Sequence, residues 1–216
     1  MKRRKEAPRV LPDLPGKDNL TPVGAEKLLA DEPIEECLIQ EIDLSDRRIP
    51  SLVALNSVIE HVSFASSRIG KFRLRDVRLV KCDLSNAVLQ GFEATRIELV
   101  DCRMTGMKAV QCRWEDVLVE NCDLRYAQLS DGHFRSSEFK SCNLGDADLR
   151  GANIEGAIFT DVMLRRADLS NARLQGTDLR GAEIEGVTVQ PEDLRGAIVN
   201  VAQAMDLSRL LGLIIK

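Results

Sequence analysis

Residues 147–161 read ADLRG ANIEG AIFTD, three pentads in which an apolar residue returns at every fifth position. A step of five residues turns an α-helix by about 500°, so these side chains would point to every side of a helix. In an extended strand, residues two apart share a face, so a step of five would alternate between faces. The period therefore predicts an extended chain that turns a corner once in every pentad.

The same register runs through most of the chain. Counting by fives from Ile39 to Val189 meets only apolar residues, and a second, usually smaller, inward position lies two residues before each of these centres. Two residues after the centre, Gly, Asn or Asp occupies 18 of 29 pentads between residues 46 and 186. These residue types tolerate turn conformations best. Each pentad is thus expected to have two inward and three outward positions.

The cysteines indicate how many pentads close one coil. Cys82, Cys102, Cys122 and Cys142 recur every twenty residues on the smaller inward position, as expected if four pentads complete a coil. Parallel thiols stacked in one column suit neither a tetrahedral metal site nor a disulfide, so we interpret them as small core residues. With these four cysteines, the predicted structural core includes Leu84, Leu124, Phe134, Leu149, Ile154, Phe159 and Leu169.

These pentads resemble the consensus A-(D/N)-L-x-x of the pentapeptide-repeat family. The resemblance is carried by residues 147–151, 152–156, 167–171 and 177–181, and it extends over roughly residues 37–198. It implies an all-β fold, a right-handed quadrilateral parallel β-helix (pentapeptide-repeat solenoid) of about 7–8 coils with short helical caps. With stacked backbones ~4.8 Å apart, the rod would be on the order of 35 Å long.

The N-terminal end departs from the repeat. Residues 1–20 are rich in Lys, Arg and Pro, which predicts a disordered basic tail. Residues 21–36 are expected to form an N-terminal helical cap, in which Thr21 is the N-cap of a short helix through Asp31. Such a cap would cover the edge of the first coil.

After the β-helix, expected over residues 37–190, residues 191–216 are predicted to form a C-terminal helical cap. Its helix would begin after Asn200 and end at Gly212. The segment is similar to that of gyrase-protecting, MfpA-type family members, in which a helix pairs two rods end to end. The similarity implies a homodimer, and a helix that only covers its own core is the alternative. The expected dimer interface consists of Met205, Leu207, Leu210, Leu211 and Ile214.

Composition excludes several classes of function. A formal net charge of -4 and a pI of about 5.4 argue against direct nucleic-acid binding. No apolar run is long enough to span a membrane, and six cysteines without an export signal favour a reducing, cytoplasmic location. The two histidines, His61 and His133, fall on outward positions several coils apart. We therefore expect no catalytic residues, no metal site and no cofactor.

Two functions remain. The first is a non-enzymatic, rod-shaped protein–protein interaction module with an unidentified protein partner. The second is DNA mimicry, which the resemblance to Qnr- and MfpA-type members implies: an acidic rod would bind DNA gyrase or topoisomerase and modulate quinolone susceptibility. Residues 115–190 carry fourteen acidic against eight basic side chains, although the arginines interrupt the negative surface. The candidate acidic surface consists of Asp148, Glu155, Asp168 and Asp178.

Overall fold

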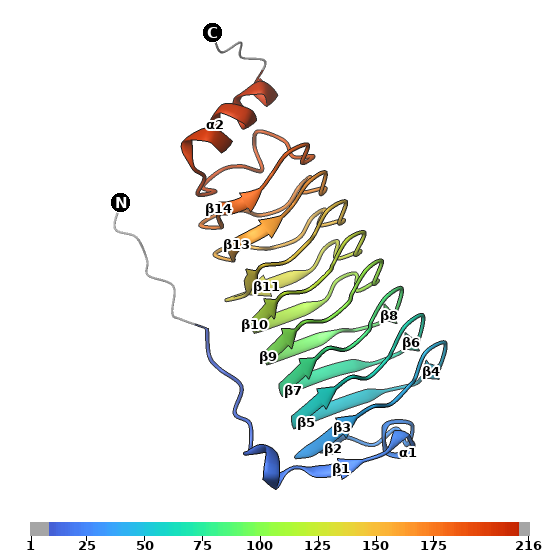
Figure 1. Cartoon of the computed structure of the whole chain (residues 1–216). Helices are drawn as coiled ribbons and strands as arrows, with labels where there is room; N and C mark the ends of the chain where they lie inside the picture. Colours follow the sequence, from blue (N-terminus) through green and yellow to red (C-terminus); the bar gives the residue numbers. More distant parts are fainter. Residues whose placement is uncertain (1–8, 212–216) are drawn as a thin grey trace.

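The computed structural model describes residues 9–211, which wind into a stack of about eight coils (Figure 1). From β2 (Ile34–Glu35) to β12 (Glu138–Lys140), the strands pair in parallel with residues twenty positions away: Leu79 lies opposite Leu99, and Trp114 lies opposite Phe134. At the N-terminal end, β1 (Thr21–Val23) pairs with β3 (Cys37–Gln40) at an offset of sixteen residues, since Thr21 lies opposite Cys37. The four-sided parallel β-helix predicted from the sequence is therefore confirmed.

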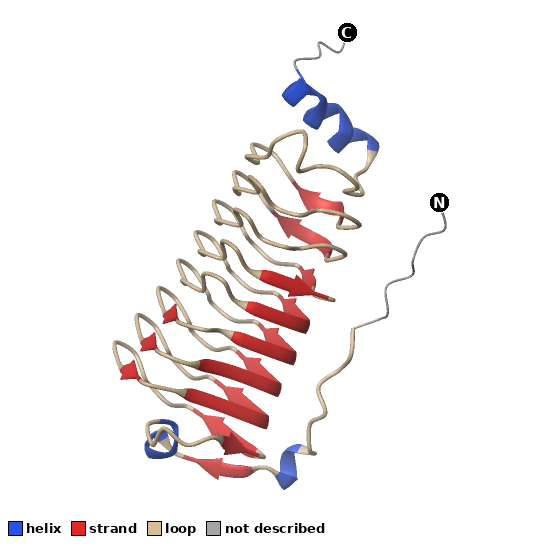
Figure 2. Cartoon of the chain, turned by 180° about the vertical axis from the view of Figure 1, so that it is seen from behind, coloured by secondary structure: helices blue, strands red, loops and turns tan. Residues whose placement is uncertain are grey.

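Most of the regular strand structure lies on two adjacent sides of the rod, and turns dominate the other two (Figure 2). The elements are η1 (Lys17–Asn19), β1 (Thr21–Val23), α1 (Ala25–Leu28), β2 (Ile34–Glu35), β3 (Cys37–Gln40), β4 (Arg48–Ile49), β5 (Leu52–Glu60), β6 (Arg68–Ile69), β7 (Phe72–Val80), β8 (Val88–Leu89), β9 (Glu93–Val100), β10 (Arg113–Glu120), β11 (His133–Arg135), β12 (Glu138–Lys140), β13 (Ile158–Met163), β14 (Asp178–Glu183), α2 (Val201–Ser208) and η2 (Arg209–Leu211).

We number the four faces by their buried rows. Face 1 contains Leu79, Leu99 and Val119; face 2 contains Leu84, Met104 and Leu124; face 3 contains Leu89, Ala109 and Leu129; and face 4 contains Leu74, Ala94 and Trp114. The long strands β5, β7, β9 and β10 each cross from face 4 to face 1. Outward side chains on one face form rows that repeat every twenty residues.

Left-handed backbone makes the corners. From Glu36 to Gly186, the corner residue of every pentad has a positive φ, except at Ser51, Lys71 and Gly181. Glycine suits this conformation best, and non-glycine residues adopt it at a cost. Glycine, asparagine and aspartate therefore favour the corner conformation by themselves. Other residue types at corners are held in it by the stacking of neighbouring coils.

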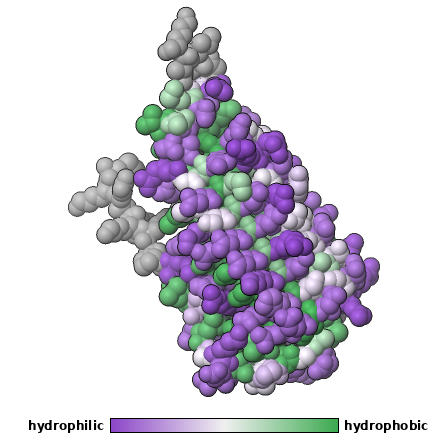
Figure 3. All heavy atoms as spheres, in the orientation of Figure 1, coloured by the Kyte–Doolittle hydropathy of each residue, from purple (hydrophilic) through white to green (hydrophobic). Residues whose placement is uncertain are grey.

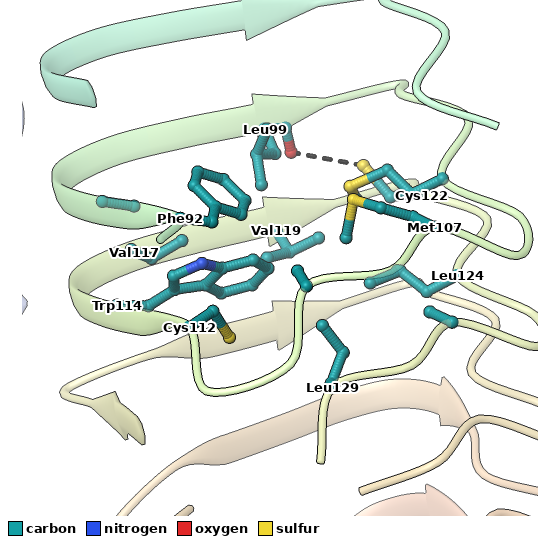
Figure 4. Close-up of a cluster of buried hydrophobic side chains, with 14 of the residues drawn as sticks. Phe92, Leu99, Met107, Cys112, Trp114, Val117, Val119, Cys122, Leu124 and Leu129 are labelled. Carbon is teal, nitrogen blue, oxygen red and sulfur yellow. Dashed lines mark hydrogen bonds between the residues drawn. The ribbon is translucent and has the colours of Figure 1, made fainter. Parts of the chain in front are cut away.

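Aromatic rings fill the middle of the shaft (Figure 4). The ring centroids of Phe72 and Phe92 lie 4.8 Å apart, those of Phe92 and Trp114 5.4 Å, and those of Trp114 and Phe134 5.1 Å. The buried indole N–H of Trp114 has no hydrogen-bond partner. The indole meets the ring of Phe92 edge to face, with the ring planes at 72°.

The N-terminal segment differs from the prediction. Residues 9–20, expected to be disordered, lie along the outside of the rod and hydrogen-bond to it (Figure 1). The prediction for residues 1–8 falls outside the described residues. The expected helix through Asp31 is present only as α1 (Ala25–Leu28), with Gly24 at its N-cap; its predicted start at Thr21 is wrong, because Thr21–Val23 forms β1 and pairs with β3. The Thr21 N–H donates to the Glu36 carbonyl at 2.8 Å, so pairing with the next coil outweighs the local capping preference.

The C-terminal helix begins where the sequence predicts. The side chain of Asn200 accepts a hydrogen bond from the Gln203 N–H, and the Gln203 side chain accepts one from the Asn200 N–H, which completes a capping box. The predicted end at Gly212 lies outside the described residues. Among residues 9–211, no helix has the length and apolar character needed to cross a membrane.

Candidate functional site

The outward side chains carry the chemistry of this molecule, because apolar residues fill its interior. The face shown in Figure 3 is mostly hydrophilic, with smaller apolar areas between the charged residues. Within the described part of the chain, a shallow groove of about 640 Å³ lies on face 4. We call it the face 4 groove. Its polar lining consists of Glu93, Thr95, Arg113, Glu115, His133, Arg135, Asn153 and Glu155.

Two rows of outward residues build this groove. Strand pairing places Arg113 between Glu93 and His133, and it places Glu115 opposite Arg135. Ion pairs follow the same rows, since Arg135 lies 3.0 Å from Glu115 and Arg113 lies 3.9 Å from Glu93. Both arginine side chains remain more than three-quarters exposed. The groove therefore presents charged groups at fixed spacing to the solvent.

The groove suits recognition of a polar surface better than enclosure of a small molecule. Its exposed Arg113 and Arg135 offer hydrogen-bond donors, and the exposed Glu155 offers acceptors that no described ion pair occupies. Ligand sites for small molecules usually bury most of their ligand, which an open face does not. Among residues 9–211, no cluster of three or more His, Cys, Asp or Glu side chains is placed to hold a metal ion.

The predicted acidic surface is divided among three faces. Asp148 and Asp168 stack on face 3 as adjacent bridge partners. Asp178 lies at the start of β14 on face 1, and Glu155 lies in the face 4 groove. The structure therefore brings only Asp148 and Asp168 of these four residues together.

Arginine neutralises much of this acidity. The carboxylate of Asp148 accepts hydrogen bonds from Nε and Nη2 of Arg150 at 2.8 and 2.7 Å, and also from its backbone N–H. This side-chain hydrogen bond with Arg150 is the main reason that the pKa of Asp148 lies below its ordinary value. Asp178 makes the same set of contacts with Arg180. An aspartate followed two residues later by arginine thus forms a self-neutralised turn.

The predicted dimer residues divide in a similar way. Met205 and Leu210 are exposed, whereas Leu207 packs partly buried against the rod's own core. The side chain of Leu211 and the whole of Ile214 lie outside the described residues. Between α2 and the last coil is an apolar groove of about 300 Å³, whose lining includes Pro191, Leu194, Val199, Leu207 and Leu210.

The predicted core residues all lie inside the shaft. None of the seven apolar residues or the four cysteines in that set is more than 3% exposed. The thiols donate to backbone carbonyls; Cys122 Sγ, for example, lies 3.2 Å from the Glu120 oxygen and 3.4 Å from the Leu99 oxygen. All six cysteines are free and buried.

Sequence reasoning missed three polar residues that join distant parts of the chain. Asp76 and Arg96 form a bidentate ion pair beneath the N-terminal segment, with shortest distances of 2.5 and 2.7 Å. Opposite charges twenty residues apart fall in neighbouring coils, so the sequence could have predicted this ion pair. Gln203 donates to the carbonyls of Leu179 and Ala182, both at 2.7 Å. Its position three residues after Asn200 indicated the capping box but not these contacts with the last coil.

Comparison with solved structures found similar chains. One is a trypsin-treated variant of QnrB1, described as a plasmid-mediated fluoroquinolone resistance protein (20% identity, 90% of this chain and 95% of that chain, TM-score 0.45). Another is HetL, a pentapeptide repeat protein involved in heterocyst differentiation regulation from Nostoc sp. strain PCC 7120 (16% identity, 78% and 86%, TM-score 0.25). A third comes from the thylakoid lumen of Arabidopsis thaliana (19% identity, 52% and 75%, TM-score 0.20). No curated protein matches the chain.

Family models give the clearer result. The model described as "Pentapeptide repeat region" matches residues 72–149, and the model described as "Pentapeptide repeats (8 copies)" matches residues 142–181. Both matches lie within the β-helix, and together they extend over residues 72–181, more than half of the chain. The chain therefore belongs to the pentapeptide-repeat family.

Proposed function

We propose that this protein is a non-enzymatic interaction module, a rod that binds a protein partner through outward side chains. The observation that carries the proposal is the face 4 groove, in which rows of charged residues stand at fixed spacing on stacked strands. Arg113 and Arg135 leave their guanidinium groups exposed, and arginine is common at the centres of protein interfaces.

Affinity capture with full-length variants tests this function. In R113E/R135E, two groove arginines change sign. The matched control is R103E/R125E, which reverses two ion-paired arginines on face 2. We expect the wild-type and control proteins to capture the same partner and R113E/R135E to lose at least ten-fold of it, measured by quantitative mass spectrometry. Equal capture by all three proteins, or no partner for any of them, would contradict the proposal.

The second candidate function is DNA mimicry toward gyrase or topoisomerase. The similarity of the C-terminal segment to MfpA-type members favours it, as does the acidic excess of residues 115–190. The pairing of Asp148 with Arg150, and of Asp178 with Arg180, weakens it by reducing the exposed negative charge. Supercoiling by purified gyrase, with and without ciprofloxacin, tests this function. A DNA mimic must inhibit or protect gyrase at micromolar protein, and an unaffected enzyme excludes it.

We further propose that the protein forms a homodimer through its C-terminal end. The exposed Met205 and Leu210, beside the apolar groove under α2, support this arrangement, because a second copy would remove apolar surface from water. Sedimentation of full-length M205D/L210D beside the wild type tests the proposal. We expect a dimer for the wild type and for a control with an exposed apolar residue changed elsewhere, I158D, but a monomer for M205D/L210D. A monomeric wild type would refute the dimer.

The proposed setting is the cytoplasm. All six cysteines are unpaired, and a reducing compartment keeps cysteines in that state. Fractionation of cells that express a tagged full-length protein would test this location, and recovery from an exported or membrane fraction would contradict it.

A further inference from the structure

The segment of residues 9–20, which we call the strap, lies against one corner of the rod (Figure 1). That corner is where β5, β7, β9 and β10 pass from face 4 to face 1. The side chains that hold the strap come from successive coils. They form a column at the corner, and the strap runs along this column. The corner column consists of Asn56, Asp76, Arg96 and Asp116, which follow one another at twenty-residue spacing.

The column binds mainly the backbone of the strap. The Val10 N–H donates to Asp116 Oδ1 at 3.1 Å, and the Asp13 N–H donates to Asp76 Oδ1 at 3.0 Å. Asn56 Nδ2 donates to the Asp13 carbonyl at 2.9 Å. Backbone contacts of this kind recognise an extended peptide without requiring particular side chains.

Charge provides the selectivity. The guanidinium of Arg9 lies 3.3 Å from Glu98 and is almost fully buried, with one Nη lacking any described partner. At the other end of the strap, Lys17 Nζ lies 2.8 Å from Glu60. Two carboxylates of the rod thus flank the column and face two cations of the strap.

The strap has little apolar attachment to the rod. Val10 and Leu11 are more than half exposed, Leu14 is only partly buried, and Leu20, at the end of the strap beside the first coil, is its one fully buried apolar residue. Segments with few buried apolar contacts open with a small free-energy cost. Opening would release the peptide-binding groups of the column while the β-helix stays folded.

We propose that this corner is a binding surface for an extended peptide of a partner protein that carries two cations at the spacing of Arg9 and Lys17, and that the strap competes with this peptide for the surface. The partner peptide needs free backbone N–H groups for Asp76 and Asp116 and two cations that reach Glu60 and Glu98. The inference rests on the proposed role as an interaction module, but it concerns a different surface from the face 4 groove. Its test uses a synthetic peptide, so its failure is distinguishable from failure of the capture experiment.

The test weakens the strap in the full-length protein. R9E/K17E places two like charges against Glu98 and Glu60, and we expect it to abolish protection of the Val10 and Asp13 amides from hydrogen exchange. A fluorescein-labelled peptide of residues 7–20 should then bind R9E/K17E at least ten-fold more tightly than the wild-type chain, measured by fluorescence anisotropy. Circular dichroism checks that the β-helix is unchanged.

A peptide in which both cations are replaced by glutamate is the matched control, and it should not bind. Three results would overturn the proposal. The strap amides could remain protected in R9E/K17E, which would show that charge does not hold the strap. The wild-type peptide could fail to bind after protection is lost. Equal binding of both peptides would show that the surface does not select the two cations.

Discussion

Gly132 leaves room for the ring of Phe134 in the same pentad. A Cβ at residue 132 would lie 2.7 Å from Cε2 of Phe134 and 2.9 Å from the Leu129 carbonyl oxygen, too close for either to remain in place. Overpacking of a filled core costs typically 1–3 kcal/mol. We therefore expect G132A to lower the free energy of unfolding by about 1–3 kcal/mol in urea melts followed by circular dichroism.

The control for this prediction is G16A. Gly16 has φ of -54°, and its added Cβ would come no closer than 3.7 Å to a neighbouring atom. The stability of G16A should change by less than about 0.5 kcal/mol. If G132A were as stable as G16A, the claim that Gly132 is small because Phe134 fills the space beside it would be contradicted.

The cysteines give a second prediction for single residues. Burial raises the pKa of Cys112 to about 12, and the thiolate is the reactive form. Because all six thiols are buried, we expect the folded protein to react with no thiol quickly in Ellman's assay at pH 8 and the denatured protein to react with all six. A fast-reacting thiol in the folded protein would contradict this interpretation.

Individual residues also explain why some features were predictable. The placement of Leu149 and Ile154 in the core follows from a local five-residue period. Asp148 and Arg150, which pair with each other, are also close in sequence. A count of acidic and basic residues does not show this pairing, because it adds the two charges without placing them. By contrast, the bond from Val10 to Asp116 joins residues 106 positions apart with no shared pattern. Sequence periodicity contains no information on such a contact.

Among the elements, α2 closes the C-terminal end of the β-helix. Gln203 is buried and donates to the carbonyls of Leu179 and Ala182 in the last coil. Leaving buried carbonyls unsatisfied costs about 1–3 kcal/mol. We expect Q203A to reduce the free energy of unfolding by about this amount. The control S208A removes a half-buried hydroxyl whose one described hydrogen bond goes to the Met205 carbonyl within the same helix, and it should change stability by less than about 0.5 kcal/mol. Equal stability of Q203A and S208A would contradict the capping role.

The strap should respond to acid. Burial would raise the pKa of Asp76, but hydrogen bonds from Arg96 and from the Asp13 N–H outweigh it and lower the pKa below its ordinary value of 3.8. A carboxyl group with a lowered pKa stabilises the folded contact above its ordinary pKa, and this contribution is lost as the pH falls through the lowered value. The charged groups near this site are Arg96 and Arg75, which lower the pKa of Asp76, together with Asp13 and Asp116, which lie near Arg96.

We therefore expect the NMR amide signals of Val10 and Asp13 to move toward those of a free chain below pH 3.8, before core amides such as Leu99 change. Asp76→Asn removes this ionisable group, so the Asp13 amide should lose the part of the early transition that comes from Asp76. The part that comes from the pair of Lys17 with Glu60, whose pKa is also lowered by that contact, should remain. Strap and core signals that change at the same pH would contradict this account.

At the scale of the whole molecule, the twenty-residue coil stacks outward charged residues into rows on each face. Cross-coil ion pairs such as Arg73 with Glu93 and Lys140 with Glu120 follow directly from the twenty-residue coil. The same register divides the acidic residues among three faces, which the net charge of residues 115–190 does not reveal. The fold was therefore predictable from the sequence, whereas the surface pattern required the position of each outward residue.

The most direct test of the central claim, that the outward residues of this rod bind a protein, is site-specific photo-crosslinking in cells. A photoreactive amino acid would replace Glu155 in the face 4 groove or, as a control, the exposed Lys81 at the corner between faces 1 and 2. We predict a specific crosslinked protein from position 155, absent from position 81 and strongly reduced when R113E/R135E is added. No crosslinked protein from position 155, or the same products from both positions, would contradict the account.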